Sequence, residues 1–253
     1  MGKSKEDNEK QDLYIIKEIS LGSKQKYWYR MINMLLKNKW IIMNHKKVLR
    51  LMKKYNLLAR IRRKNPYKQI MKSTQEHRTV RNLLNREFKW DCPYNKIWTD
   101  ITYIKFKWKW VYLSIAKDMI TSEILSEEVS DNLWLWIVYN TLDNLKEKYI
   151  NWELKGALFH SDQWFHYTHP SFWENIKKLG CIQSMSRRWN CIDNAPTESF
   201  FGHMKDEIDA SKCKTFEELE AYIKNYIFYY NNNRPQWNKK KMTPVEYRNH
   251  LLS

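Results

Sequence analysis

The chain has 253 residues, enough for one sizeable core and a small accessory domain, and a formal net charge of +17. Residues 1–80 hold 21 Lys and Arg against 6 Asp and Glu, while the remainder holds 24 against 22. A basic block on a nearly neutral body predicts a nucleic-acid partner. The four cysteines show no zinc spacing, and no apolar stretch approaches the roughly 20 residues of a membrane span. Composition therefore disfavours secreted disulfide scaffolds and membrane proteins, and predicts a cytoplasmic, nucleoid-associated protein.

The N-terminal part predicts a small helical domain. Residues 1–11 are polar and are expected to form a disordered tail, and residues 12–64 predict two short helices joined by a tight turn. Asn44 can cap the second helix, whose opposite face is basic, so a helix-turn-helix-like DNA-binding domain is favoured over a plain helical hairpin. The cations expected to contact DNA phosphates there are Lys46, Lys47, Arg50, Lys53, Lys54, Arg62, Arg63 and Lys64.

Residues 65–93 predict a basic linker, and residues 94–253 predict an α/β core. The core begins with three β-rich runs and short polar connections, which indicate an antiparallel meander over residues 97–104, 110–116 and 123–129. Helical and strand patterns then alternate. Helices are expected over 132–148, 171–179, 216–231 and 244–251 and around Glu198, with strands over 157–161 and 181–185. This order predicts a mixed sheet flanked by helices.

Three acids stand at positions that favour chemistry. Asp100 lies within a β-type run, where an acid is costly unless something pairs with it, and Asp162 ends a buried strand. Glu198 lies in the first turn of a helix, 36 residues after Asp162. Taken singly, Asp162 could be a loop acid and Glu198 a partner of the helix dipole, but neither explanation covers Asp100. Three carboxylates on rigid elements can bind a pair of Mg²⁺ ions, which clamp a phosphodiester.

Several motifs resemble the catalytic protein of insertion-sequence-3 family transposases. They are Trp98-Thr99-Asp100-Ile101-Thr102-Tyr103, His160-Ser161-Asp162-Gln163, Ser186-Arg187-Arg188 running into Asn190-Cys191-Ile192-Asp193-Asn194-Ala195-Pro196, Glu198-Ser199-Phe200-Phe201, and Met242-Thr243-Pro244-Val245-Glu246-Tyr247. The resemblance runs from about residue 12 to the end of the chain.

This resemblance implies an RNase H-like, retroviral-integrase-like core in which Asp100, Asp162 and Glu198 are the DDE ligands of two Mg²⁺ or Mn²⁺ ions. It implies cleavage of DNA at the element ends and transfer of the freed strand to a target. Arg187, Arg188 and Lys205 are expected to contact DNA beside the metals. The expected partners are element-end and target DNA, further copies of the chain on DNA, and an upstream-frame (OrfA-type) protein or fusion.

Two alternatives to an active transposase remain open from the sequence. One is a catalytically impaired relic that binds DNA through its N-terminal domain, and the other is a metal-dependent nuclease of the same superfold that cuts without joining. The presence of all three acids favours an active enzyme over a relic. Apart from the family resemblance, the sequence offers little to distinguish a transposase from a nuclease of the same fold.

The tryptophan content is unusual, with 13 Trp against 5 Gly. Several tryptophans stand where the family that this chain resembles typically has glycine, namely Trp28, Trp40, Trp108, Trp164 and Trp189. Glycine suits turns and places of close backbone approach. One hypothesis is that these are UGA codons that the organism reads as glycine. The alternative is that they are real aromatic residues that stack on DNA bases or pack in a core.

Overall fold

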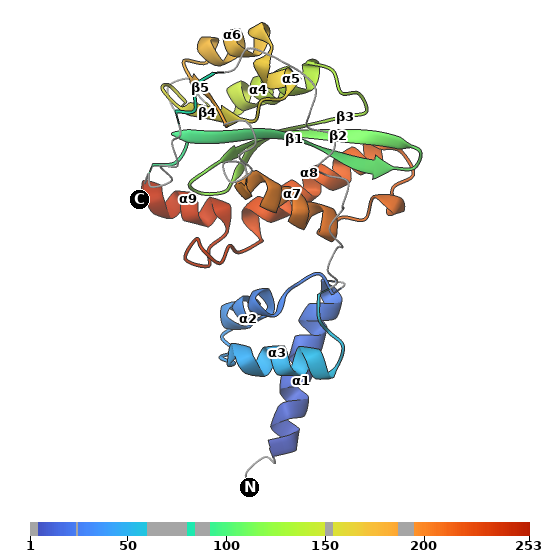
Figure 1. The fold of residues 1–253 in the computed structure, drawn as a ribbon. Helices are drawn as coiled ribbons and strands as arrows, with labels where there is room; N and C mark the ends of the chain where they lie inside the picture. The colour runs from blue at the N-terminus through green and yellow to red at the C-terminus, as the bar shows by residue number, and fades with distance from the viewer. Residues whose placement is uncertain (1–4, 24, 60–79, 84–91, 150–153, 187–194) are drawn as a thin grey trace. The chain divides into compact units, whose positions relative to one another are not determined.

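A computed structural model describes residues 5–23, 25–59, 80–83, 92–149, 154–186 and 195–253; the side chains of residues 5–7 and 195–198 are not part of this description. The chain divides into two compact units, residues 1–66 and residues 67–253 (Figure 1). Each unit has its own buried hydrophobic cluster or clusters. Among the described residues, no helix is both long and apolar enough to span a membrane.

The first unit contains three helices, α1 (Lys5–Gly22), α2 (Tyr29–Asn38) and α3 (His45–Lys54). The Asn44 side chain accepts a hydrogen bond from the Lys46 backbone N–H, which confirms the predicted cap. The prediction of a disordered tail over residues 1–11 is wrong from Lys5 onward, because α1 begins there. Its packing surface supplies Ile16 to the core of the unit, which also contains Ile32, Leu36, Met43, Val48, Leu51, Met52 and Leu57.

The backbone conformation at the tryptophans tests whether glycine would fit there, and the positions differ. Trp40 follows α2 with φ +61° and its side chain is 92% exposed, a left-handed conformation that favours glycine. Trp28 and Trp164 precede helices with φ −69° and −72°, which any residue adopts. In the hairpin that contains Trp108, the left-handed residue is Lys107, and Trp189 lies outside the described residues. Among the four of these positions that the structure describes, backbone geometry supports glycine at position 40 alone.

Replacing Trp40 with Gly is expected to stabilise the first unit by about 1 kcal/mol, because glycine occupies left-handed backbone without steric penalty. Trp40→Ala removes the aromatic ring but keeps Cβ, so it should recover little of this gain. Trp164→Gly, at an extended position, should not stabilise the protein at all. Urea unfolding monitored by circular dichroism distinguishes the three variants, and equal effects of Trp40→Gly and Trp40→Ala would contradict the backbone explanation.

The second unit is built on a five-stranded sheet in the order β3-β2-β1-β4-β5. Strands β1 (Lys96–Phe106), β2 (Lys109–Asp118) and β3 (Ile124–Ser130) form the predicted antiparallel meander. Strands β4 (Leu158–Ser161) and β5 (Ile182–Met185) then add in parallel at the other side of β1. The central strand β1 is therefore paired on both edges.

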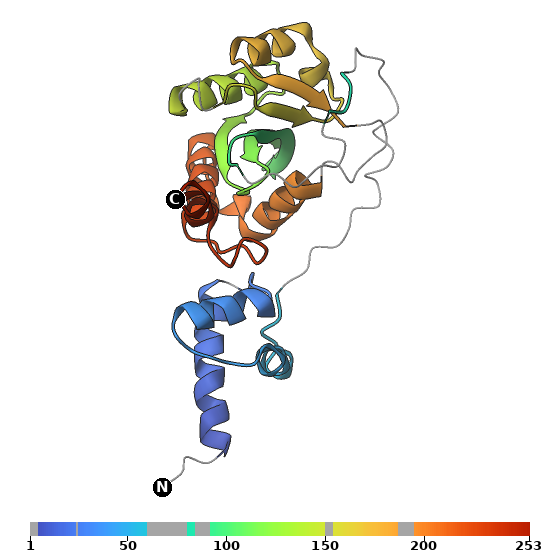
Figure 2. The same cartoon turned by 90° about the vertical axis from the view of Figure 1, so that its left-hand side faces the viewer.

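Helices cover both faces of the sheet (Figures 1 and 2). Helices α4 (Trp136–Lys148), α5 (Phe165–Thr168) and α6 (Pro170–Lys178) pack on the face to which β1 contributes Ile97 and Ile101. Helices α7 (Ala195–Glu207) and α8 (Phe216–Asn232) pack on the opposite face, with Ile104 and Phe106. A short 3₁₀ turn η3 (Ala210–Lys212) follows α7, and α9 (Pro244–Leu252) is the last helix described.

Part of the predicted linker contacts the core. The backbone N–H of Leu83 donates to the Ser184 hydroxyl at 3.0 Å, and that of Val80 lies 3.4 Å from the Met185 sulfur. Val80 also packs against the buried cluster beneath α4 and α6. The segment from residue 80 to residue 83 therefore belongs to the second unit, next to the edge strand β5.

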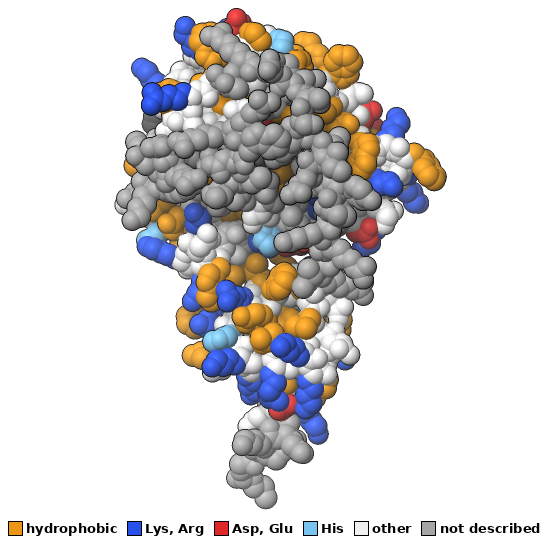
Figure 3. Space-filling view, viewed as in Figure 1, with side chains coloured by type: hydrophobic (Ala, Val, Ile, Leu, Met, Phe, Trp, Pro, Cys, Tyr) orange, Lys and Arg blue, Asp and Glu red, His pale blue; other side chains and the backbone are white. Residues whose placement is uncertain are grey.

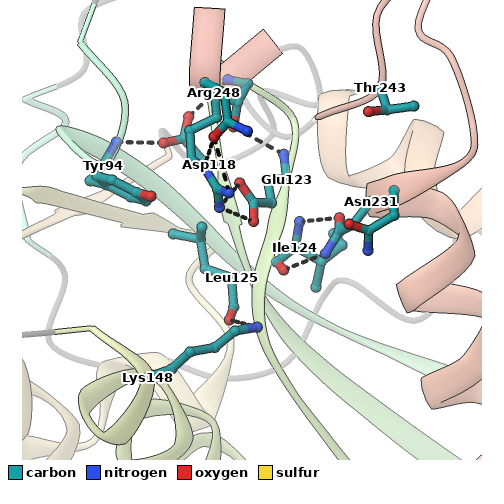
Figure 4. A network of polar contacts seen from close by, with 12 residues as sticks. Tyr94, Asp118, Glu123, Ile124, Leu125, Lys148, Asn231, Thr243 and Arg248 are labelled. Carbon is teal, nitrogen blue, oxygen red and sulfur yellow. Dashed lines mark hydrogen bonds and ion pairs between the residues drawn. The ribbon is translucent and has the colours of Figure 1, made fainter. Parts of the chain in front are cut away.

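A polar network fastens α9 to the hairpin between β2 and β3 (Figure 4). The Arg248 Nη1 atom donates to both carboxylate oxygens of Glu123, at 2.7 and 2.9 Å, and Glu123 is only 3% exposed. Asp118 accepts from the backbone N–H groups of Tyr94, Ile120 and Thr121 and so closes the turn after β2. Burial raises the pKa of Glu123, and the Arg248 guanidinium opposes that rise.

Arg248→Met should lower the free energy of unfolding by about 3 kcal/mol, because it leaves a buried carboxylate without its cation. For a unit of this size, that corresponds to a fall of roughly 6–12 °C in Tm. The matched control is Lys224→Met, which breaks the exposed pair with Glu220 on α8 and should change stability by less than about 0.5 kcal/mol. Differential scanning calorimetry measures both, and a Tm of Arg248→Met equal to that of the control would contradict the assignment.

Candidate active site

Asp100 is held in the middle of the longest strand. It is half-buried, and its backbone faces Ile115 across the β1–β2 ladder. Alternation along β1 places Asp100 on the same face as Ile104 and Phe106, the face that α7 covers. One carboxylate oxygen accepts from the Ile101 backbone N–H at 2.8 Å. Strand β1 therefore holds the Asp100 side chain on the sheet face that α7 covers.

Asp162 follows β4 directly and is also half-buried. Its Oδ1 accepts from the Trp164 backbone N–H at 2.9 Å, which makes a tight turn. Gln163 donates to the Ser186 carbonyl at 3.0 Å and ties this turn to the residue after β5. Before it, the His160 ring and the Ser184 hydroxyl are hydrogen-bonded at 3.0 Å across β4 and β5. Through His160 and Gln163, the His-Ser-Asp-Gln motif therefore hydrogen-bonds the end of β4 to β5 and the residue that follows it.

Strand register brings the two aspartates to the same level. Trp98 on β1 pairs with His160 on the parallel strand β4, and each aspartate lies two residues further along its chain. Neighbouring strands are about 4.8 Å apart. Asp100, within β1, and Asp162, just after the carboxyl end of β4, therefore lie at the same level of two adjacent parallel strands, and ligands of α/β sheets bind near such strand ends.

Tyr167 on α5 packs in the buried cluster that contains Ile97 and Ile101. Its side chain is fully buried, with its hydroxyl 3.5 Å from the Thr99 Oγ1. Burial raises the pKa of Tyr167 well above its usual value, and the negative charges of Asp100 and then Asp162 raise it further. No motif in the sequence marks Tyr167, a buried tyrosine in a four-residue helix.

The structure places Glu198 in α7, the helix that packs against β1. Its side chain is outside the described residues, so its convergence with Asp100 and Asp162 stays a prediction. Among the described side chains, no group of three or more His, Cys, Asp and Glu is close enough to hold a metal ion. The two aspartates supply hard oxygen donors of the kind Mg²⁺ takes, and a third donor would have to come from a residue such as Glu198.

The predicted DNA contacts on α3 divide into two groups. Glu9 on α1 accepts from Arg50 at 2.8 Å and Lys54 at 3.1 Å, and Asp12 pairs with Lys47. Hydrogen bonds from Arg50 and Lys54 lower the pKa of Glu9 to about 2.

Lys46 and Lys53 are exposed and lie seven residues apart on one stripe of α3; within the described ranges they have no ion pair. Lys and Arg side chains gather on this unit (Figure 3).

Lys205 on α7 lies with its Nζ 4.7 Å from the Tyr103 ring. The other predicted contacts, Arg62, Arg63, Lys64, Arg187 and Arg188, lie outside the described residues.

Comparison with protein families defines the class of this chain. Models described as "Integrase core domain" match residues 91–191 and 198–252, and one described as "HTH-like domain" matches residues 6–65. A chain of the cryo-electron-microscopy structure of the simian T-cell lymphotropic virus intasome, solved with PP2A regulatory subunit B56 gamma, superposes with a TM-score of 0.55 at 11% identity. That match covers 81% of this chain and 67% of the other. The fold is an RNase H-like integrase core preceded by a helix-turn-helix-like domain.

Sequence relatives identify the family. One relative is named as the transposase InsK of insertion sequence element IS150 from Escherichia coli (strain K12). It is 34% identical over 92% of this chain and 81% of its own length. The transposase for insertion sequence element IS904 of Lactococcus lactis subsp. lactis is 30% identical over 87% of this chain and 86% of its own length. This chain belongs to the insertion-sequence-3 family of transposases and acts in insertion-sequence transposition.

Proposed function

We propose that this transposase cuts the DNA strand at the ends of its element and transfers the freed 3′-OH to a second strand, using two divalent metal ions bound by Asp100, Asp162 and Glu198. The observation that carries the proposal is the register of β1 and β4, which sets two aspartates at one level next to α7. Bound Mg²⁺ or Mn²⁺ ions would supply charge neutralisation at the phosphodiester and a more acidic water.

The protein's own contribution is to hold its ligands still. The antiparallel ladder with β2 fixes the backbone of Asp100, and the turn to Trp164 and the hydrogen bond from Gln163 to Ser186 fix Asp162. Rigid elements lower the cost of organising the site at the moment of reaction, which is where most of the acceleration in phosphoryl transfer arises. No serine or tyrosine nucleophile is needed, since water attacks the phosphodiester in the cutting step and the freed 3′-OH attacks the second strand in the joining step.

The partners follow from the two units. We propose that the first unit binds DNA through the exposed stripe of Lys46 and Lys53, and that Lys205, Arg187 and Arg188 contact DNA near the carboxylates. Several copies of the chain would act together on the two element ends, with an upstream-frame protein or fusion, in the cytoplasm at the nucleoid. Positive charge concentrated in residues 1–80 supports a DNA-binding role for the first unit.

The test is an assay that separates cutting from joining. Purified protein is incubated with Mg²⁺ and a labelled duplex that carries the element end, and products are resolved on a denaturing gel. A transposase yields both the cut strand and longer joined products, and chelation with EDTA removes both. Cut strands without joined products would instead identify a nuclease, and metal-independent products would rule out the proposed chemistry.

A further inference from the structure

The last residue of α7 forms an ion pair within the protein. Glu207 Oε1 accepts from Arg234 Nε at 3.1 Å and from its Nη2 at 2.8 Å, and each side chain is 7% exposed. The other oxygen, Oε2, accepts from the Tyr226 hydroxyl at 3.1 Å. Tyr226 lies in α8 and Arg234 follows that helix. The two carboxylate oxygens of Glu207 thus bind α7 to α8 from two directions.

Near this pair lie buried apolar and aromatic side chains together with two further polar groups, His203 on α7 and the buried Lys117, whose Nζ is 5.8 Å from the centroid of the Phe200 ring. Phe200 and Met204 on α7 are fully buried, and the Phe200 ring meets the Tyr230 ring edge-on at 4.8 Å. Replacing a buried ion pair with apolar residues of similar volume is often neutral or stabilising, because desolvation offsets much of the attraction. Stability alone therefore gives a weak reason for charge at this point. Because the Arg234 guanidinium donates two N–H groups to one carboxylate oxygen, the contact is directional and restrains the end of α7 against the segment that follows α8.

Orientation matters because of what α7 carries. Glu198 lies nine residues before Glu207, or about 13.5 Å along the helix axis. A tilt of roughly 5° about Glu207 would move the Glu198 backbone by about 1.2 Å over that length. Functional constellations tolerate about 0.5 Å, and Mg²⁺ demands near-ideal octahedral geometry. A small loss of restraint at the Glu207 end of α7 would therefore displace Glu198 at the other end by more than a metal site tolerates.

We propose that Glu207 and Arg234 are positioning residues for the third carboxylate: their pair sets the angle of α7 and so places Glu198 relative to Asp100 and Asp162. This inference rests on the proposed function, in which Glu198 binds metal. The pair contacts neither DNA nor metal in this scheme. Tyr226 completes it by holding the second oxygen of Glu207, which prevents the carboxylate from rotating.

The experiment uses full-length protein and a matched control pair. Glu207→Gln and Arg234→Lys loosen the α7 pair, while Glu123→Gln and Arg248→Lys loosen the buried pair that ties α9 to the β2–β3 hairpin. All four are expected to lower Tm. Mn²⁺ binding is measured by electron paramagnetic resonance of the free ion, and the Mg²⁺ dependence of cleavage is measured with the labelled duplex.

The α7 variants should bind Mn²⁺ at least about fivefold more weakly and need about tenfold more Mg²⁺ for half-maximal cleavage, with Mn²⁺ restoring much of the rate. The control variants should keep the metal dependence of the wild-type protein at a similar loss of Tm. A double variant that exchanges the charges, Glu207→Arg with Arg234→Glu, should recover part of the metal affinity if the pair is what matters.

Two results would overturn the inference, and they differ. Equal metal dependence in the α7 variants and the controls would show that the pair serves stability alone, with the proposed function untouched. Mn²⁺ binding that Glu198→Gln leaves unchanged would remove Glu198 from the metal site, and the proposed function would fail together with the inference.

Discussion

Asp100→Asn should abolish Mg²⁺-dependent strand cleavage and joining, and Asp162→Asn and Glu198→Gln should do the same. Each change removes one negative oxygen donor from a site that must hold two cations close together. The loss expected for a single electrostatic element of an active site is on the order of 10²–10³-fold, and removal of a metal ligand should reach at least the upper end. Initial rates on the labelled element-end duplex, at saturating Mg²⁺, measure it.

DNA affinity and Tm are the controls for this prediction. All three variants should bind the duplex within about twofold of the wild-type protein, because the DNA-binding cations are unchanged. Asp206→Asn provides a matched neutral change, since Asp206 is an exposed acid in α7, the helix of Glu198. Joining at more than a tenth of the wild-type rate in any one of the three would take that residue out of the metal site.

The second large effect concerns DNA binding by the first unit. A chain that begins at residue 80 retains the segment packed on β5 and both hydrophobic clusters of the core, and it should lose most non-specific DNA affinity. Contacts with 6–10 phosphates would make full-length binding fall by about 10³–10⁵ between 50 and 200 mM salt, because counterions are released. Fluorescence anisotropy over a salt series measures both chains.

Point variants sharpen the same prediction. Lys46→Gln combined with Lys53→Gln in the full-length chain should reduce the slope of log affinity against log salt by about 2, one phosphate contact for each lysine. An unchanged slope would show that the exposed stripe of α3 faces away from DNA. Equal affinity and slope for the truncated and full-length chains would refute the division of roles between the two units.

Most of the fold could be predicted because its signals are local. Alternating β-branched and aromatic residues predicted β1 to β3, and the sheet order agrees with the integrase-like core that the motifs implied. The longest element that was not predicted is the first helix. A polar sequence such as Lys5 to Gln11 has no apolar stripe of its own, and its helix is stabilised by the packing of Ile16 further along. The contact of residues 80–83 with β5 could not be predicted either, because a four-residue extended segment shows no sequence periodicity.

The candidate site was predictable where it rests on strands. The sequence predicts Asp100 within one strand and Asp162 at the end of another, and the β1–β4 register then brings them level. The pairing of Lys47, Arg50 and Lys54 with acids of α1 could not be foreseen, because α1 itself was not expected. The Glu207–Arg234 pair joins residues 27 positions apart through tertiary packing, for which no sequence spacing rule exists.

The topology of the sheet also sets an order of assembly during synthesis. The β1–β2–β3 meander uses neighbouring segments and can pair as soon as they leave the ribosome, whereas the other edge of β1 waits for β4. From residue 100 to residue 162, translation at about 5–20 residues per second takes roughly 3–12 s. For that interval the central strand β1 of the nascent chain has one unpaired edge, which is open to wrong partners. Each new molecule thus acquires its paired aspartates late, after its DNA-binding unit is complete.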